Sequence, residues 1–261
     1  MIGTLMGSDD FVPHYRIVTV FPEMFSALSE YGVTGRACKS GICQVSLYNL
    51  RDYGKEPRRR VDDRPFGGGA GMVLMPEPLS LALRAACSDA GSCDVPVVYM
   101  SPQGKVLDQD LCLHLSGMSS IVFVCGRYEG VDQRIIDNYV TDEVSIGDYI
   151  LTGGDLAAMV VLDAVIRLLP GSVGDPDSVR HESFSGGLLD WPQYTRPVAF
   201  DGVSVPEVLL SGNHSSIARW RLKQSLGRTW LKRPDLIRCR GLSEYEEKLL
   251  GEFLFESSRQ V

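Results

Sequence analysis

The sequence predicts an α/β protein in which a parallel-sheet domain is followed by a small all-helical C-terminal domain. Apolar runs typical of β-strands alternate with amphipathic helical runs as far as about residue 169. Three of these strand runs lead directly into loops of glycine and polar residues, at 101–104, 126–130 and 146–154. From about residue 203 onward the signals are helical only, which indicates a second domain of a different class.

The first elements follow a short polar tail at residues 1–14. The run YRIVTVF at 15–21 is typical of a buried strand. Pro22 is placed to open a helix and Gly32 to close it. A second strand is expected at 43–47.

Residues 51–73 contain no periodicity and many glycines, so we expect a long loop of the kind that is usually functional or mobile. The rest of the sheet domain is expected to alternate helices at 76–90, 106–115, 132–139 and 155–169 with strands at 95–100, 121–125 and 140–146. The helix at 155–169 is apolar almost all round, so it is buried on most sides or lies at an interface.

The composition changes after Pro170, and the following residues are rich in Gly, Ser, Asp and Pro, which indicates a linker. Ser243, followed three residues later by Glu246, is a capping box that opens the last helix. We therefore place a tail at 1–14, the sheet domain at 15–173, the interdomain linker at 174–189 and the helical domain at 190–261.

The composition is typical of a globular protein and argues against a membrane or secreted protein. The chain has 261 residues, an ordinary apolar content of 44% and a net charge of −7. No apolar run reaches the 18 residues of a membrane span, and the N-terminus does not resemble a signal peptide. The seven cysteines are scattered and form no CxxC pair, which favours reduced thiols in a cytoplasmic protein.

The charges are distributed unevenly. Residues 219–240 hold eight Lys and Arg against one acidic residue, with Trp220 and Trp230 interleaved, and a second basic cluster lies at 58–64. Local basic density with aromatic residues is expected where a protein binds the phosphate backbone of a nucleic acid. A solvated helical face over buried tryptophans would give the same pattern.

The three glycine-rich strand ends predict a ligand pocket, because ligands of open α/β sheets bind at the carboxyl ends of the strands. Glycine lets main-chain N–H and C=O groups approach a ligand closely. Tyr128, Glu129, Asp148 and Tyr149 would add a few directed contacts. No GxGxxG follows the first strand and no Walker A sequence is present, so neither a Rossmann dinucleotide site nor a P-loop is expected. The pattern favours a nucleoside-type pocket made mostly of main chain.

Long motifs of the chain resemble a known family. They are FPEMF, GVTGRA, VDDRPFGGGAGM, SPQG, CGRYEGVD, SIGDYILTGGDLAAMVVLDAVIRLLPG, HESFSGGLLDWPQYTRP and WRLKQSLGRTWLKRPDL. In this order and spacing they resemble the bacterial tRNA (guanine-N1)-methyltransferases, the TrmD family of the SPOUT methyltransferases, over about residues 15–250. The resemblance implies a deep trefoil knot in the sheet domain, S-adenosyl-L-methionine as methyl donor, and a homodimer whose active sites are shared between subunits. It also implies methylation of N1 of the guanine at tRNA position 37 when another guanine precedes it.

The reaction requires a base and a cationic donor, because neutral guanine carries a proton on N1 and gains negative charge toward O6 as the methyl arrives. The resemblance assigns the cation to Arg167; an arginine snorkelling near a helix end is the structural alternative. It assigns the base to Glu182, where the family pattern has Asp before Ser-Phe. His181 is a rival base, and Asp177 a weaker linker alternative.

The same resemblance implies the binding residues. For the cofactor they are Pro102, Gly104, Gly126, Tyr128, Glu129, Gly130, Ile146, Gly147, Asp148, Tyr149, Ile150, Leu151, Gly153 and Gly154. For RNA they are Arg58, Arg59, Arg64, Arg219, Arg221, Lys223 and Arg228. Glu129 lies near the sulfonium or the methionine amine, or else caps a loop. The resemblance allows for Mg²⁺, although the sequence contains no ligand cluster that would specify a metal site.

Two other functions compete with this one. A SPOUT relative would methylate another RNA position or a ribose 2′-OH, but the Arg167 and carboxylate pair favours base N1. A catalytically silent RNA-binding module would keep the basic helices and tolerate broken loops at 101–104 and 146–154, which are intact here.

Overall fold

The computed structural model describes residues 11–91, 94–175, 178 and 182–258. The chain folds as two units, Met1–Gly174 and Asp175–Val261. His181 and Asp177, the two alternatives for the general base, lie outside the described residues. Among the described residues, no helix is long and apolar enough to cross a membrane.

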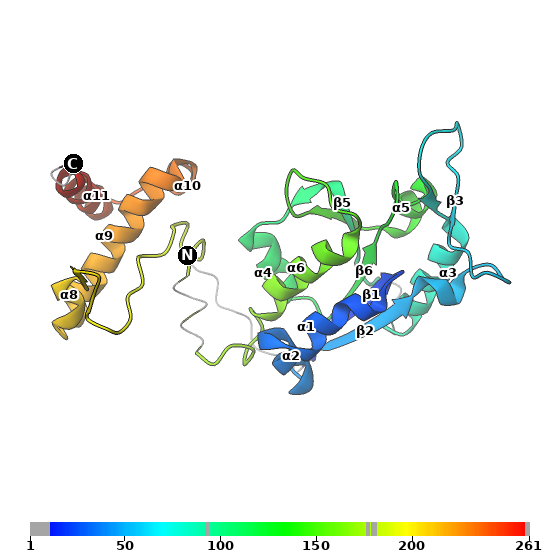
Figure 1. The fold of residues 1–261 in the computed structure, drawn as a ribbon, viewed down its shortest axis with the longest axis horizontal. Helices are drawn as coiled ribbons and strands as arrows, with labels where there is room; N and C mark the ends of the chain where they lie inside the picture. Colours follow the sequence, from blue (N-terminus) through cyan, green and yellow to red (C-terminus); the bar gives the residue numbers. More distant parts are fainter. Residues whose placement is uncertain (1–10, 92–93, 176–177, 179–181, 259–261) are drawn as a thin grey trace. The chain divides into compact units, whose positions relative to one another are not determined.

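The first unit is built on a five-stranded sheet in the order β2-β1-β6-β5-β7 (Figure 1). Every neighbouring pair is parallel, which confirms the predicted class. The strands are β1 (His14–Thr19), β2 (Gln44–Asn49), β5 (Val97–Val106), β6 (Ser120–Cys125) and β7 (Asp142–Ser145). A separate antiparallel pair, β3 (Asp62–Asp63) with β4 (Val73–Leu74), closes the base of the glycine-rich segment between them.

Helices cover both faces of this sheet. Within β1, Ile17 belongs to one apolar cluster and Val18 to the other, as expected when successive side chains of a strand point to opposite faces. The first cluster includes residues of α1 (Ser26–Glu30), α2 (Gly32–Lys39), α4 (Gln109–Ser116) and α6 (Gly154–Ile166). The second includes residues of α3 (Pro76–Ser88) and α5 (Gln133–Tyr139). Two 3₁₀ turns, η1 (Pro22–Phe25) and η2 (Leu50–Tyr53), complete the unit.

Two local predictions for this unit were wrong. Gly32 does not end the N-terminal helical region: α1 stops at Glu30, and Gly32, with φ +66°, starts α2. The segment 101–104 is not a free loop, because β5 runs through it and pairs with β7 on both sides of an irregularity between Met100 and Lys105. Because the strand is irregular at this point, its residues do not alternate between apolar and polar, and the sequence pattern did not predict that β5 continues beyond Met100.

The second unit contains α8 (Glu207–Leu210), α9 (His214–Lys232), α10 (Pro234–Arg240) and α11 (Glu244–Ser257). Leu226, Leu249 and Leu250 form its small apolar core. The prediction that this domain is all-helical was wrong in one detail, since β8 (Ala199–Phe200) pairs with β9 (Val203–Ser204). The turn between them is Asp201-Gly202, both at positive φ, which is a recognised hairpin signal.

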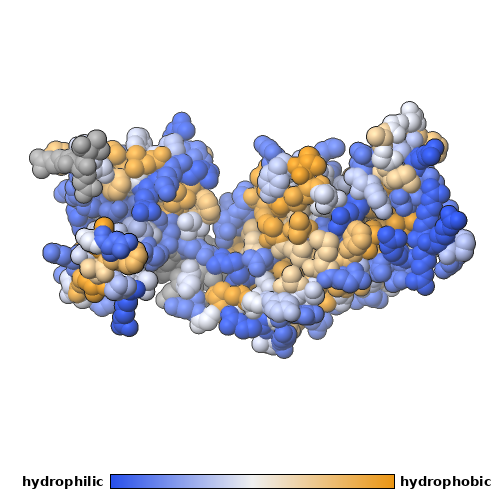
Figure 2. Space-filling view, viewed as in Figure 1, coloured by the Kyte–Doolittle hydropathy of each residue, from blue (hydrophilic) through white to orange (hydrophobic). Residues whose placement is uncertain are grey.

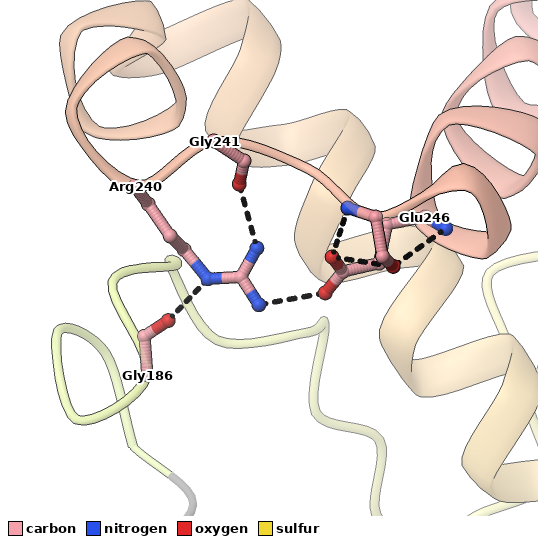
Figure 3. Close-up of polar contacts among 5 residues, drawn as sticks. Gly186, Arg240, Gly241 and Glu246 are labelled. Carbon is pink, nitrogen blue, oxygen red and sulfur yellow. Dashed lines mark hydrogen bonds and ion pairs between the residues drawn. The ribbon is translucent and has the colours of Figure 1, made fainter. Parts of the chain in front are cut away.

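The predicted capping box at the start of α11 is confirmed. The Ser243 side chain accepts from the Glu246 backbone N–H, while the Glu246 carboxylate accepts from the Ser243 backbone. Figure 3 shows that the same carboxylate also accepts from the guanidinium of Arg240, at 2.6 Å. Arg240 donates in addition to the carbonyls of Gly186 and Gly241, so the ends of α10 and α11 and the preceding loop are held together.

Candidate functional site

A cavity of about 440 Å³ opens at the carboxyl ends of β5, β6 and β7. The three predicted segments meet there, although the nearest two, 126–130 and 146–154, are 16 residues apart in the sequence. The predicted cofactor residues that line the cavity are Pro102, Gly126, Tyr128, Glu129, Gly130, Ile146, Gly147, Tyr149, Ile150, Leu151, Gly153 and Gly154. The cavity therefore combines main-chain groups of glycines with apolar and tyrosyl side chains and with the charged side chains of Arg127, Glu129 and Glu143.

Two predicted residues, Gly104 and Asp148, are not among those that line the cavity. A Cβ at Gly104 would overlap the backbone of Glu143 and Val144, so this glycine lets β5 lie close against β7. The close approach of these two strands explains why glycine is needed at position 104, without reference to a ligand.

Gly154 joins two of the loops. Its N–H donates to the carbonyl of Gly126 at 2.8 Å, and a Cβ there would lie 3.1 Å from the Cys125 Cα. That distance is tighter than most real Cβ contacts, so a larger residue would push the loops apart. Close packing at this point brings the two glycine-rich segments to the same side of the cavity.

A buried ion pair, which the sequence did not reveal, anchors both loops. The Arg127 guanidinium donates to the Asp155 carboxylate at 2.8 Å, and only 1% of the Asp155 side chain is exposed. The Thr19 hydroxyl at the end of β1 donates to the other oxygen of Asp155. The Arg127 guanidinium also lies over the Phe21 ring, 4.5 Å from its centroid. The loop after β6, the start of α6 and the end of β1 are therefore tied to one carboxylate.

The signal for this pair was present in the quoted motifs, since Arg127 stands in CGRYEG and Asp155 ends TGGD. A charged residue beside an apolar helix needs a partner when it is buried. Cys125 lies next to this pair; burial foremost, together with the Asp155 charge, raises the pKa of the Cys125 thiol well above its usual value. Cys125 is therefore an inert buried thiol rather than a nucleophile.

Glu129 connects the cavity with the glycine-rich segment. Its N–H donates to the Met72 carbonyl at 2.9 Å, and Leu74 donates to the Gly130 carbonyl at 3.0 Å. A Cβ at Gly71 would overlap the Glu129 side chain, so the segment passes directly over this carboxylate. Phe66, at the tip of the same segment, is 99% exposed. A movement of this glycine-rich segment would therefore also displace Glu129 at the edge of the cavity.

The two predicted catalytic residues belong to different units. Arg167 follows α6 directly, is half-buried, and donates its N–H to the Asp163 carbonyl at 3.2 Å. Glu182 is half-buried in the second unit, where it lines a cavity of about 560 Å³ together with Trp191 and Arg221. Their roles stay predictions.

The predicted RNA-binding Lys and Arg side chains differ in their exposure and in the groups that they contact. Arg219 and Lys223 on α9 pair with Glu252 and Glu256 on α11, and Lys223 is only 8% exposed. The Arg221 guanidinium lies 4.8 Å from the Trp191 ring centroid. In the other cluster Arg58, Arg59 and Arg64 are all exposed. A phosphate contact by Arg219, Lys223 or Arg59 would have to compete with an existing ion pair. The Arg59–Asp52 pair is exposed on both sides, whereas Lys223 is largely buried.

Comparison with known proteins decides the family. The family model described as "tRNA (Guanine-1)-methyltransferase TrmD" matches residues 14–239. The chain belongs to this family. It is similar to the tRNA (guanine-N(1)-)-methyltransferases of Nitrosospira multiformis and Idiomarina loihiensis, each 53% identical, over 92% and 93% of this chain and 96% of each relative. The enzyme of the same name from Aromatoleum aromaticum is 50% identical over 93% of both chains.

Membership of the TrmD family gives the cavity a chemical meaning. A methyltransferase of this family acts on tRNA guanine and implies S-adenosyl-L-methionine as the methyl donor. The main-chain and apolar groups that line the 440 Å³ cavity, together with the charged side chains of Arg127, Glu129 and Glu143, fit a nucleoside with a short charged side chain. Within the described part of the chain, no group of three or more His, Cys, Asp or Glu is placed to hold a metal ion.

Proposed function

We propose that this chain transfers a methyl group from S-adenosyl-L-methionine to N1 of the guanine at position 37 of tRNA, next to the anticodon. The observation that carries the proposal is the meeting of β5 with the glycine-rich loops after β6 and β7 in one cavity, in a chain of the tRNA (guanine-N1)-methyltransferase family.

The cavity at the strand ends holds the cofactor. Backbone groups of Gly126, Gly130 and Gly153 bind the adenine and ribose, and Ile146 and Leu151 pack against the ring. The bound cofactor supplies a methyl carbon on a sulfonium sulfur. Arg127 and Asp155 do not react; they hold the two loops at the separation that the cofactor requires. We infer that these loops thread past one another in a deep trefoil knot of the SPOUT type, and the hydrogen bond from the Gly154 N–H to the Gly126 carbonyl, which holds them side by side, supports this inference.

Glu182 and Arg167 prepare the guanine. Guanine N1 is protonated at neutral pH, so the Glu182 carboxylate accepts that proton as the methyl is transferred. The Arg167 guanidinium donates to O6, where negative charge develops, and lowers the barrier. Glutamate has the acid chemistry of the aspartate in the family pattern with one more methylene, so its backbone sits slightly farther from the base.

A homodimer with shared active sites accounts for the separation of these two residues into different units. α6, which precedes Arg167, exposes 48% of Leu156 and 47% of Val160, and nearby Ile150 is 80% exposed. Figure 2 shows apolar side chains gathered over the region of α4 and α6. Such a patch is typical of a protein–protein interface. A second copy would cover it and supply Glu182 to the Arg167 of its partner.

The tRNA is bound by the basic residues of both units, in the cytoplasm. Arg221 and Arg228 on α9, with Arg58, Arg59 and Arg64 of the 51–73 segment, contact phosphates and give affinity without sequence information. The base itself is selected by being flipped into the site. We expect the 51–73 segment to become ordered against tRNA, because it carries these exposed arginines and is bonded through Met72 to Glu129 at the edge of the cofactor cavity.

The proposal is tested with tritiated S-adenosyl-L-methionine and two tRNA transcripts that differ only in carrying guanine or adenine at position 37. Label should enter the guanine transcript as 1-methylguanosine and be absent from the adenine transcript. Label in both transcripts, or on a ribose, would contradict the proposal. A Glu182→Gln variant should lose turnover while its melting temperature still rises with the cofactor, which separates the base from the binding site.

A further inference from the structure

Two cysteines lie side by side at the turn between α2 and β2. Cys38 is on the last turn of α2 and Cys43 directly precedes β2, and their Sγ atoms are 3.7 Å apart. The turn is short and tightly bonded: Ser40 donates to the Arg36 carbonyl at 2.8 Å and Ile42 to the Ala37 carbonyl at 2.9 Å. A disulfide needs an S–S separation of about 2.05 Å. The two sulfurs therefore have little distance left to close.

The two thiols are not equivalent. Cys38 is half-buried and can be reached from solvent, whereas Cys43 is 1% exposed. The hydrogen bond between them lowers the pKa of Cys38 to about 7, so a large fraction of Cys38 is thiolate near neutral pH. The same hydrogen bond, with burial, raises the pKa of Cys43. An accessible thiolate beside a buried thiol is the arrangement of an attacking and a resolving cysteine.

We propose that Cys38 and Cys43 form a redox site, which low-molecular-weight disulfides of the glutathione class convert into an intramolecular disulfide. In the first step the Cys38 thiolate attacks one sulfur of the external disulfide, whose S–S bond breaks and releases one thiolate. That thiolate takes the proton of Cys43. The Cys43 sulfur then attacks the Cys38 sulfur and expels the second thiol group as a thiolate, which is protonated from solvent. Two protein thiols are oxidised, and one external disulfide is reduced to two thiols.

The site lies next to a segment that the proposed mechanism uses. Ile42, inside the turn, is packed against the apolar cluster that includes most of α6. Its Cδ1 atom would lie 3.5 Å from a Cβ at Gly171, four residues after Arg167. Closing the disulfide tightens the turn that holds Ile42, so the modification acts beside the C-terminal end of α6 rather than at a remote surface.

The test uses the whole folded chain incubated with oxidised glutathione, alkylated under denaturing conditions and digested with trypsin without reduction. Trypsin cleaves after Arg36, Lys39 and Arg51, so a disulfide would join peptide 37–39 to peptide 40–51. We expect this joined pair, lighter by two hydrogens than the separate peptides, and its loss on reduction. Exposed Cys239 is the internal control that shows the reagent is active. Glutathione retained on Cys38, or both cysteines alkylated while Cys239 is modified, would overturn the proposal.

Two single variants test the assigned roles. In Cys43→Ser, Cys38 should stop at the mixed disulfide with glutathione, because the resolving thiol is absent. In Cys38→Ser, Cys43 should stay alkylatable and carry no glutathione, because it is buried. Modification of Cys43 in this variant at the rate of Cys239 would show that it is reached directly and would overturn the assignment. Far-UV circular dichroism before oxidation checks that both variants are folded.

Discussion

Replacing Asp155 by Asn should destabilise the first unit and weaken its cofactor site together. The substitution keeps the shape of the side chain and removes the charge that faces Arg127 at 2.8 Å. Removing one partner of a buried ion pair costs about 3–5 kcal/mol, because the other charge is left buried. Arg127 is 16% exposed and keeps its contact with Phe21, so we expect the lower end, about 3 kcal/mol.

The assay separates the two units. All three tryptophans, Trp191, Trp220 and Trp230, lie in the second unit, so tryptophan fluorescence during urea unfolding reports on that unit. Circular dichroism reports on both. Asp155→Asn should lower the midpoint of the transition seen by circular dichroism but not by tryptophan fluorescence. It should also weaken S-adenosyl-L-methionine binding by about tenfold or more, or about 1.4 kcal/mol, because the loops lose their common anchor.

The matched control is Glu77→Gln. The Lys55–Glu77 pair has a similar separation, 2.6 Å, but both side chains are more than 60% exposed. Exposed pairs contribute only about 0–1 kcal/mol, so this change should have little effect. A double variant that also replaces Arg127 by Met should recover part of the lost stability, since no buried charge then remains unpaired. An Asp155→Asn protein as stable as the control, with unchanged cofactor affinity, would refute the reasoning.

The hydrogen bond from Arg240 lowers the pKa of Glu246 from its usual 4.5 to about 2. Because the folded-state pKa is lowered, this contact stabilises the second unit above pH 4.5, and its contribution is lost as the pH falls toward 2. A Glu246→Gln variant should therefore differ from the parent in tryptophan-detected unfolding at pH 7 and converge with it near pH 2, and a constant difference would count against the contact. A Cβ at Gly227 in α9 would overlap the Phe253 ring, whereas a Cβ at Gly251 in α11 would meet open space. Gly227→Ala should therefore destabilise the second unit, and Gly251→Ala should stabilise it by up to about 1 kcal/mol. Equal effects of the two variants in urea unfolding would argue against tight packing of α9 on α11. Arg167→Ala should abolish methyl transfer while the cofactor-induced rise in melting temperature persists, and turnover at the parent rate would remove Arg167 from the mechanism.

The features that the sequence predicted well depend on local patterns. The apolar runs of β1 and β6 and the glycines after β6 and β7 are contiguous signals, and parallel topology then brings the loops together. The Ser243 capping box likewise depends on residues three apart.

What the sequence did not predict depends on contacts between distant residues or on weak local signals. Arg127 and Asp155 are 28 residues apart, and Thr19 is 136 residues from Asp155, so no periodicity relates them. The proximity of Cys38 and Cys43 depends on how a tight turn leaves α2, which spacing alone does not determine. The short β8–β9 hairpin was missed because two-residue strands carry no alternation.

The central claim is that the cofactor binds among main-chain groups at the carboxyl ends of β5, β6 and β7. Hydrogen–deuterium exchange measured by mass spectrometry, with and without S-adenosyl-L-methionine and in the absence of tRNA, tests it most directly. We predict that protection on cofactor binding is concentrated at residues 126–130 and 146–154. Protection confined to other parts of the chain, with these segments unchanged, would contradict the account.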